Sequence, residues 1–133
     1  MPAKMLCEVN RIRHNQGLQP LGLDEGLNKS AAQHSKVQAA NNAMGHQFYG
    51  EATPMQRMDQ YGNWMRAAEN VAYGWETPEV AMQKWVGSPD HYANMMLPDL
   101  THFGAGVAYS GSTPYWTQNF GKDTRKPKDI PQC

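Results

Sequence analysis

Histidine and serine are the residues of this chain whose spacing best suits nucleophilic chemistry. Ser88 lies three residues before His91, so a hydroxyl group and an imidazole that could activate it are close in the sequence. The chain contains no G-x-S-x-G elbow, which would expose such a serine at a strand-to-helix turn. Serine before proline, here Pro89, is typical of a helix start, so we favour a capping role for the Ser88 hydroxyl.

The other histidines fall in different surroundings. His34 lies on the face of a predicted helix beside Ser35, where a hydrogen-bonded polar group next to the core is favoured over a ligand. His14 and His102 are expected at the surface. His46 lies in a predicted loop.

Two cysteines, Cys7 and Cys133, lie near the ends of the chain. A cysteine-based zinc knuckle is excluded, since there is no C-x-x-C and no third cysteine. Two alternatives remain, a disulfide formed in an oxidising compartment or two unrelated free thiols. We favour the disulfide, because closing so long a loop contributes up to ~5 kcal/mol in the chain-entropy account. It would tie the basic tail, residues 122–133, back to the first helix.

The composition predicts one domain, residues 1–133, with a real core. Lys+Arg and Asp+Glu are both 12, so the formal charge of zero speaks against a nucleic-acid partner. Mean hydropathy is −0.73, and no apolar run reaches the roughly 20 residues of a transmembrane segment. We recognise no signal peptide, which leaves a mature exported chain or a protein that is not exported. A monomer is the favoured oligomeric state.

The hydrophobic pattern predicts an α+β fold. The predicted elements are helices over residues 4–15, 24–42 and 55–61, further helix starts at Thr77 and Ser88, and strands over residues 69–73, 103–109 and 115–120. Asp24 is the expected N-cap of the second helix, whose polar stripe suggests that it lines a cleft. Trp85 and Trp116 are predicted to lie in the core.

Six short motifs follow one another along residues 5–121. They are Val9-Asn10 with Arg13, Gly17-Leu18 and Pro20-Leu21; Ala31 to Ser35; Glu69-Asn70-Val71-Ala72-Tyr73-Gly74; Thr77-Pro78-Glu79 through Trp85 to Ser88-Pro89-Asp90-His91 and Asn94; Gly104 to Ala108; and Tyr115 to Gly121. Together they resemble the short microbial form of the cysteine-rich secretory protein, antigen 5 and pathogenesis-related (CAP) superfamily. Ala68 departs from the pattern, which usually has glycine before the motif glutamate.

The resemblance implies a three-layer α-β-α sandwich with a small, mainly antiparallel central sheet and a large surface cleft. It also implies a secreted, extracellular protein and a cleft tetrad of His46, Glu69, Glu79 and His91. His46 and His91 would then form a weak zinc site, with the glutamates orienting them. General acid/base catalysis and a purely structural set of Glu–His hydrogen bonds stay open as alternatives.

Two classes of function follow from the resemblance. The first is a secreted binding protein for a sterol or fatty acid, in which the methionines and tryptophans supply an apolar groove. The second is a metal-assisted hydrolase or peptidase that uses the four tetrad residues, and a signalling or host-interaction module is a further alternative. The sequence leaves open whether Asn28, in an N-x-S sequon, is glycosylated.

Overall fold

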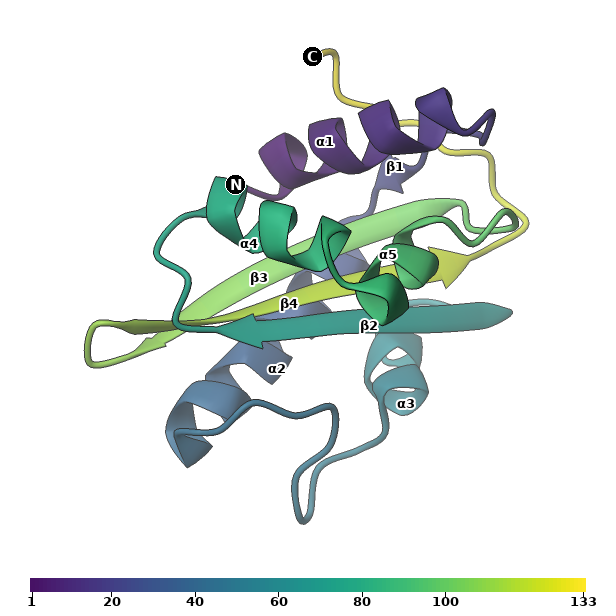
Figure 1. The fold of residues 1–133 in the computed structure, drawn as a ribbon. Helices are drawn as coiled ribbons and strands as arrows, with labels where there is room; N and C mark the ends of the chain where they lie inside the picture. The colour runs from purple at the N-terminus through teal and green to yellow at the C-terminus, as the bar shows by residue number, and fades with distance from the viewer.

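A four-stranded sheet separates two layers of helices (Figure 1). The computed structural model describes all residues from Met1 to Cys133. The strands are β1 (Gly22–Leu23), β2 (Arg66–Tyr73), β3 (His102–Ser110) and β4 (Thr113–Lys122), in the spatial order β1-β3-β4-β2. Only β1 and β3 run parallel, so the sheet is mainly antiparallel and the predicted α+β sandwich is confirmed.

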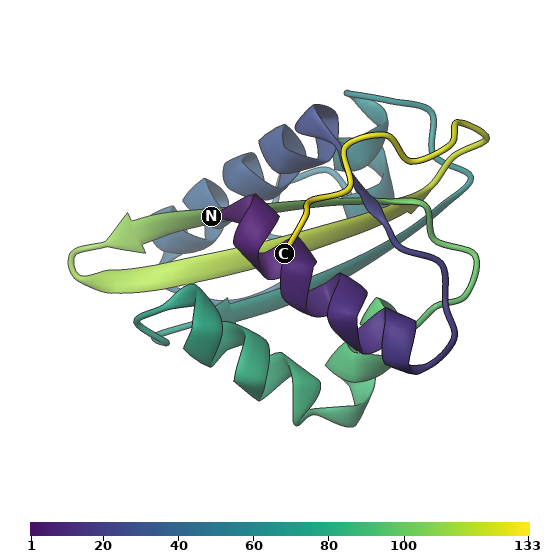
Figure 2. The ribbon, with the colours of Figure 1, turned by 90° about the horizontal axis from the view of Figure 1, so that it is seen from above.

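Helices cover both faces of this sheet. One face carries α1 (Pro2–Asn15), α4 (Pro78–Val86) and α5 (Pro89–Met95), and the other carries α2 (Glu25–Asn41) and α3 (Pro54–Asp59). Seen from above, α1 crosses over the sheet and the C-terminal tail runs beside it (Figure 2). No helix combines the length and the apolar character that a membrane span requires.

Two of the three predicted helix starts are capped as expected. Asp24 and Thr77 each accept a hydrogen bond from a backbone N–H in the first turn of their helix. The predicted capping role of Ser88 is wrong, because its side chain makes no cap bond and pairs with His91 instead.

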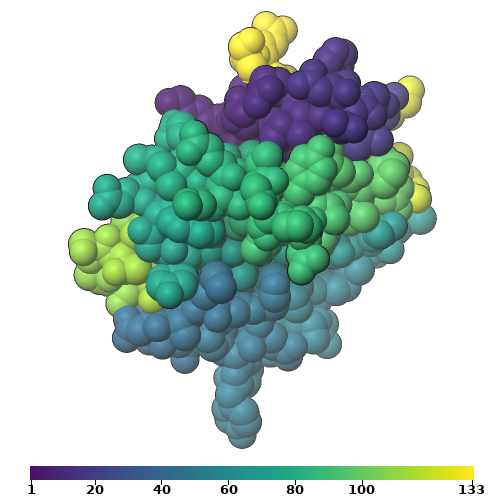
Figure 3. Space-filling model, viewed as in Figure 1, coloured from purple at the N-terminus to yellow at the C-terminus, as the bar shows by residue number.

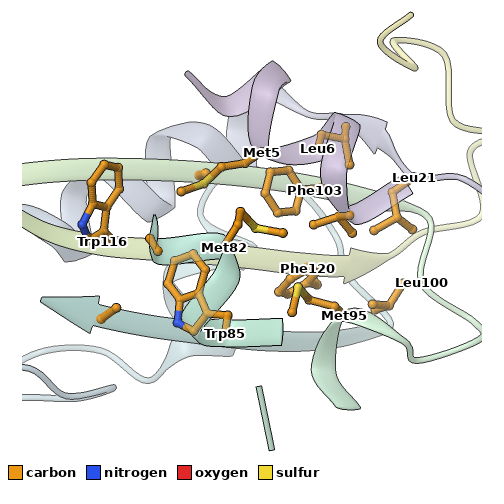
Figure 4. Packing of buried hydrophobic residues seen from close by; sticks show 14 residues of the cluster. Met5, Leu6, Leu21, Met82, Trp85, Met95, Leu100, Phe103, Trp116 and Phe120 are labelled. Carbon is orange, nitrogen blue, oxygen red and sulfur yellow. The ribbon is translucent and has the colours of Figure 1, made fainter. Parts of the chain in front are cut away.

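An apolar core fills the space between the sheet and the helices α1, α4 and α5 (Figure 4). We call this the apolar layer; its buried residues are Met5, Leu6, Val9, Leu21, Ala72, Ala81, Met82, Trp85, Met95, Leu100, Phe103, Ala105, Trp116 and Phe120. Trp85 and Trp116 are almost fully buried, as predicted.

The opposite face of the sheet is polar where it meets α2. Oγ of Ser30 donates to Oδ1 of Asn119 at 2.6 Å, and the hydroxyls of Ser35 and Thr117 lie 2.8 Å apart. We call this the polar layer. Its close contact depends on Gly104, because a Cβ there would lie only 2.2 Å from the backbone of α2.

Two expectations about surface exposure are wrong. The polar stripe of α2 does not line a cleft, since His34 and Gln38 are fully buried against the sheet and the following loop. His102 is only 4% exposed, because the alternation of β3 turns its ring toward Trp64, with centroids 5.6 Å apart. Oδ1 of Asn28 accepts the N–H of Ala105, so the sequon lies in a packed helix.

The predicted disulfide between Cys7 and Cys133 is present and closes a loop across a sequence separation of 126 residues. The tail also contacts the sheet, where the N–H of Leu23 donates to the carbonyl of Asp129 at 2.8 Å. The tail is therefore tied both to α1 and to β1.

Candidate functional site

His46 is held at the surface by the buried carboxylate of Glu69. Nδ1 of His46 lies 2.9 Å from Oε1 of Glu69, and the His46 side chain is 54% exposed. The structure thus brings together two of the four predicted tetrad residues. When the carboxylate accepts a proton from Nδ1 of a neutral ring, Nε2 keeps a free lone pair.

Glu69 lies on the face of β2 that points toward α2 and α3. It is paired with Asn119 of β4, whose Nδ2 donates to Oε2 at 2.8 Å, and Nη1 of Arg57 donates to the same oxygen at 2.8 Å. Burial alone would raise the pKa of Glu69, but hydrogen bonds from His46 and Arg57 and the charges of Arg57 and His34 outweigh it and lower that pKa. Glu69 is therefore ionised at neutral pH.

Three further ionisable groups join Glu69 beneath the loop that follows α2. Nδ1 of His34 lies 2.6 Å from Oε2 of Glu51, and Nε of Arg57 lies 3.3 Å from the same oxygen. None of these side chains is more than 9% exposed. We call His34, Glu51, Arg57 and Glu69 the charge cluster.

The sequence predicts His34 as a hydrogen-bonded polar group next to the core, but it indicates neither Glu51 nor Arg57 as its neighbours. Glu51 lies 17 residues from His34, and Arg57 lies 12 residues from Glu69, on separate elements. Such pairs follow no helix or strand period, so no pattern in the sequence indicates them.

His91 lies on α5, on the other face of the edge strand β2. Its Nδ1 is 2.9 Å from Oγ of Ser88, and its carbonyl accepts from Nδ2 of Asn70 at 3.1 Å. Burial and the nearby charge of His46 lower the pKa of His91, and Asp90 opposes this only in part. His91 is therefore neutral at neutral pH, and the two imidazoles are close enough to interact electrostatically.

An open hollow of about 380 Å³ lies beside His91. Its lining consists of Met44, Val71, Tyr73, Gly74, Trp75 and His91. His46 is two residues from Met44 but is not part of the lining. The hollow thus offers one neutral base among mostly apolar and aromatic groups.

The structure does not bring Glu79 to the other tetrad residues. Glu79 lies in the first turn of α4, is 61% exposed, and has Oε1 3.9 Å from Nζ of Lys4. No group of three or more His, Cys, Asp or Glu side chains is arranged to hold a metal ion. A metal at His46 and His91 would therefore have at most two protein ligands, and water would complete its shell.

Glu79 instead borders a second hollow, of about 400 Å³, between α1 and α4. We call it the α1–α4 groove; its lining is Glu8, Arg11, Ile12, Glu79, Met82, Gln83 and Val86. The apolar members are buried or half-buried, whereas the charged members are exposed. The groove therefore combines an apolar floor with a polar rim, and its volume lies within the range of small-molecule sites.

Comparison with known proteins points to the same family that the sequence motifs resemble. The sequence profile of the cysteine-rich secretory protein family matches residues 6–120. The uncharacterized protein YkwD of Bacillus subtilis is 39% identical over 118 residues, which cover 88% of this chain and 45% of that protein. The chain thus spans less than half the length of this curated relative.

Solved structures show the same architecture. An extracellular protein of Bacillus anthracis containing an SCP domain superposes with a TM-score of 0.81 and 27% identity, covering 92% of this chain and 40% of that one. An outer surface protein of Borrelia burgdorferi superposes with a TM-score of 0.82 and 24% identity, covering 90% of both chains. The second likeness concerns the fold alone.

Proposed function

The chain belongs to the cysteine-rich secretory protein (CAP) family, and we propose that it acts outside the cell by binding a sterol or a fatty acid in the α1–α4 groove. Extracellular action is supported by the extracellular origin of the Bacillus anthracis protein that it resembles. It is also supported by the disulfide, since disulfides persist in oxidising compartments.

The observation that carries the proposal is the apolar floor of the groove beneath a charged rim. Ile12, Met82 and Val86 form the floor. At the rim, Nη2 of Arg11 pairs with Oε2 of Glu8 at 2.8 Å. An amphipathic ligand would place its hydrocarbon on the floor and its hydroxyl or carboxylate at the rim, where Arg11 and Gln83 supply donors.

The test is a titration of purified protein with a fluorescent fatty acid and a fluorescent sterol. We expect saturable binding of at least one of them at micromolar protein. Val86→Gln places a polar group on the floor and is expected to weaken binding about tenfold, equivalent to about 1.4 kcal/mol.

Val80→Gln is the matched control, because Val80 lies on the same helix but does not line the groove. Its affinity should equal that of the wild type. Absence of saturable binding in the wild type, or equal losses in the two variants, would remove the proposal.

A second candidate is a metal-assisted hydrolase at His46 and His91. It is favoured by the 2.9 Å contact between Glu69 and Nδ1 of His46, since a carboxylate on the far nitrogen is common for metal-binding histidines. Imidazole nitrogens are ligands that suit zinc, which as a Lewis acid would activate water when bound. Glu69 orients His46, and Glu79 has no part in this arrangement.

This candidate is tested by zinc titration and by turnover of a panel of peptides and esters with added zinc. Both zinc affinity and turnover should fall in His46→Ala and in His91→Ala. Equal rates of turnover for the wild type and His91→Ala would end the hydrolase candidate.

A further inference from the structure

Residues 43–53, which we call the strap, connect α2 to α3 without helix or strand and project from the body of the molecule (Figure 3). Side chains of the two flanking helices hold its backbone. The carbonyl of Gly45 accepts from Nε2 of His34 at 2.6 Å, and the carbonyl of His46 accepts from Nη2 of Arg57 at 2.7 Å. The position of the strap, and of the His46 side chain that it carries, therefore depends on the charge cluster.

The two ring nitrogens of His34 both face hydrogen-bond acceptors. Nδ1 lies 2.6 Å from Oε2 of Glu51, and Nε2 lies 2.6 Å from the carbonyl of Gly45. A carbonyl cannot donate, and the carboxylate of Glu51 acts as an acceptor here, since it also accepts the N–H of Phe48 at 3.1 Å. A neutral imidazole has a single N–H, so the closed strap requires His34 to carry both protons.

The charges around His34 balance only when it is protonated. It faces Glu51 of the strap and Glu69 of β2, whose Oε1 is 3.8 Å from Nε2, and Arg57 of α3 contacts both carboxylates. From β4, Thr117 and Asn119 face α2 and are uncharged. From the strap, the His46 ring also contacts Oε1 of Glu69 at 2.9 Å, but this ring is 54% exposed and reaches water. Among the buried groups, two cations thus match two anions.

Loss of one proton from His34 would disturb this arrangement in two ways. The cluster would keep an unmatched negative charge in a buried place. In addition, a nitrogen lone pair would face an oxygen lone pair at 2.6 Å, because one acceptor loses its donor. Both changes are relieved when the strap moves away and water enters.

We propose that a proton on His34 closes the strap, which opens as the pH rises. Opening releases one proton, so its equilibrium constant increases by up to tenfold per pH unit. Opening also separates His46 from Glu69 and exposes the charge cluster. This inference concerns the strap alone and does not depend on which ligand the α1–α4 groove binds.

Hydrogen exchange of the wild-type protein between about pH 5.5 and pH 8 tests the proposal, once rates are corrected for the intrinsic pH dependence of exchange. The amides of Gly45, Phe48 and Glu51 form hydrogen bonds in the closed strap. Their protection should fall by up to tenfold per pH unit, while protection in β4 stays constant. Unchanged protection of the strap over this range would overturn the proposal.

His34→Gln removes the titrating ring and should abolish the pH dependence of strap protection. His14→Gln is the matched control, because it removes an exposed imidazole at the end of α1, outside the strap, and it should behave as the wild type. If His34→Gln does not fold, the ¹⁵N signals of the wild-type His34 ring decide: two protonated nitrogens at low pH and one at high pH support the proposal. A single protonated nitrogen throughout, or a persisting pH dependence in His34→Gln, would refute it.

Discussion

The two faces of the central sheet differ in what holds them to their helices. In β4, Trp116 and Phe120 point into the apolar layer, whereas Thr117 and Asn119, which lie between them in the sequence, point into the polar layer. Apolar contacts are non-directional and tolerate adjustment, but hydrogen-bonded polar groups need partners at fixed distances. The difference suggests a division of roles, in which the apolar layer supplies most of the stability and the polar layer fixes the position of Glu69 and, through it, His46.

The largest effect is expected from a cavity in the apolar layer. Phe103→Ala removes a fully buried ring and should lower the free energy of unfolding by about 4 kcal/mol. Urea denaturation followed by circular dichroism measures it. A loss below about 2 kcal/mol would contradict the assignment of the main stabilising role to this layer.

In the charge cluster, which lies on the polar side of the sheet, Arg57→Met should cost about 3 kcal/mol, because it leaves the carboxylates of Glu69 and Glu51 buried without their cation. Adding Glu69→Gln should recover part of this loss, since it removes one unpaired charge. A second truncation in the apolar layer, Phe120→Ala added to Phe103→Ala, should only add to the damage. If the second substitution restored stability in both double variants, or in neither, the two layers would not differ in this way.

The sequence predicts the apolar layer and the helix caps better than the contacts of the polar layer. Trp85 and Trp116 are identified by their type and spacing alone, and Asp24 and Thr77 by short-range capping rules. The caps depend only on neighbouring residues in the chain. The tryptophans need only an apolar environment, whichever residues provide it.

The candidate site depends instead on contacts between distant segments. The family resemblance implies that His46 and Glu69 lie together, but it does not indicate Arg57, because the partners of Arg57 lie on a loop and a strand. Ser88 fits a capping pattern, yet its hydroxyl bonds to His91. Glu79 matches a motif in the sequence, but it lies in the first turn of α4 and its carboxylate faces Lys4 of α1.

Single hydrogen bonds of the polar layer should have smaller effects. Ser35→Ala removes a hydroxyl that contacts Thr117 and the carbonyl of Gly106, and should cost about 1 kcal/mol by urea denaturation. Ser112→Ala, in the exposed hairpin turn, is the control and should be neutral. A neutral Ser35→Ala would indicate that water replaces this contact readily.

The smallest effect on stability near neutral pH is expected from Glu69, because its carboxylate titrates only in acid. Its pKa is lowered in the folded protein, so its contribution to stability is complete above the ordinary glutamate pKa of about 4.3. The contribution is lost as the pH falls from there through the lowered pKa. Thermal unfolding from pH 7 to pH 2 should show an acid-side loss that is reduced in Glu69→Gln, and identical profiles for the two proteins would contradict it.

The ligand-binding proposal can be tested most directly by NMR of methionine methyl groups during titration with a fatty acid or a sterol. Met82 lines the α1–α4 groove, Met44 lines the hollow beside His91, and Met58 is buried on the polar face of the sheet. We predict a saturable shift of the Met82 signal, with Met44 and Met58 unchanged. A shift confined to Met44, or no shift of Met82 at saturating ligand, would contradict the account.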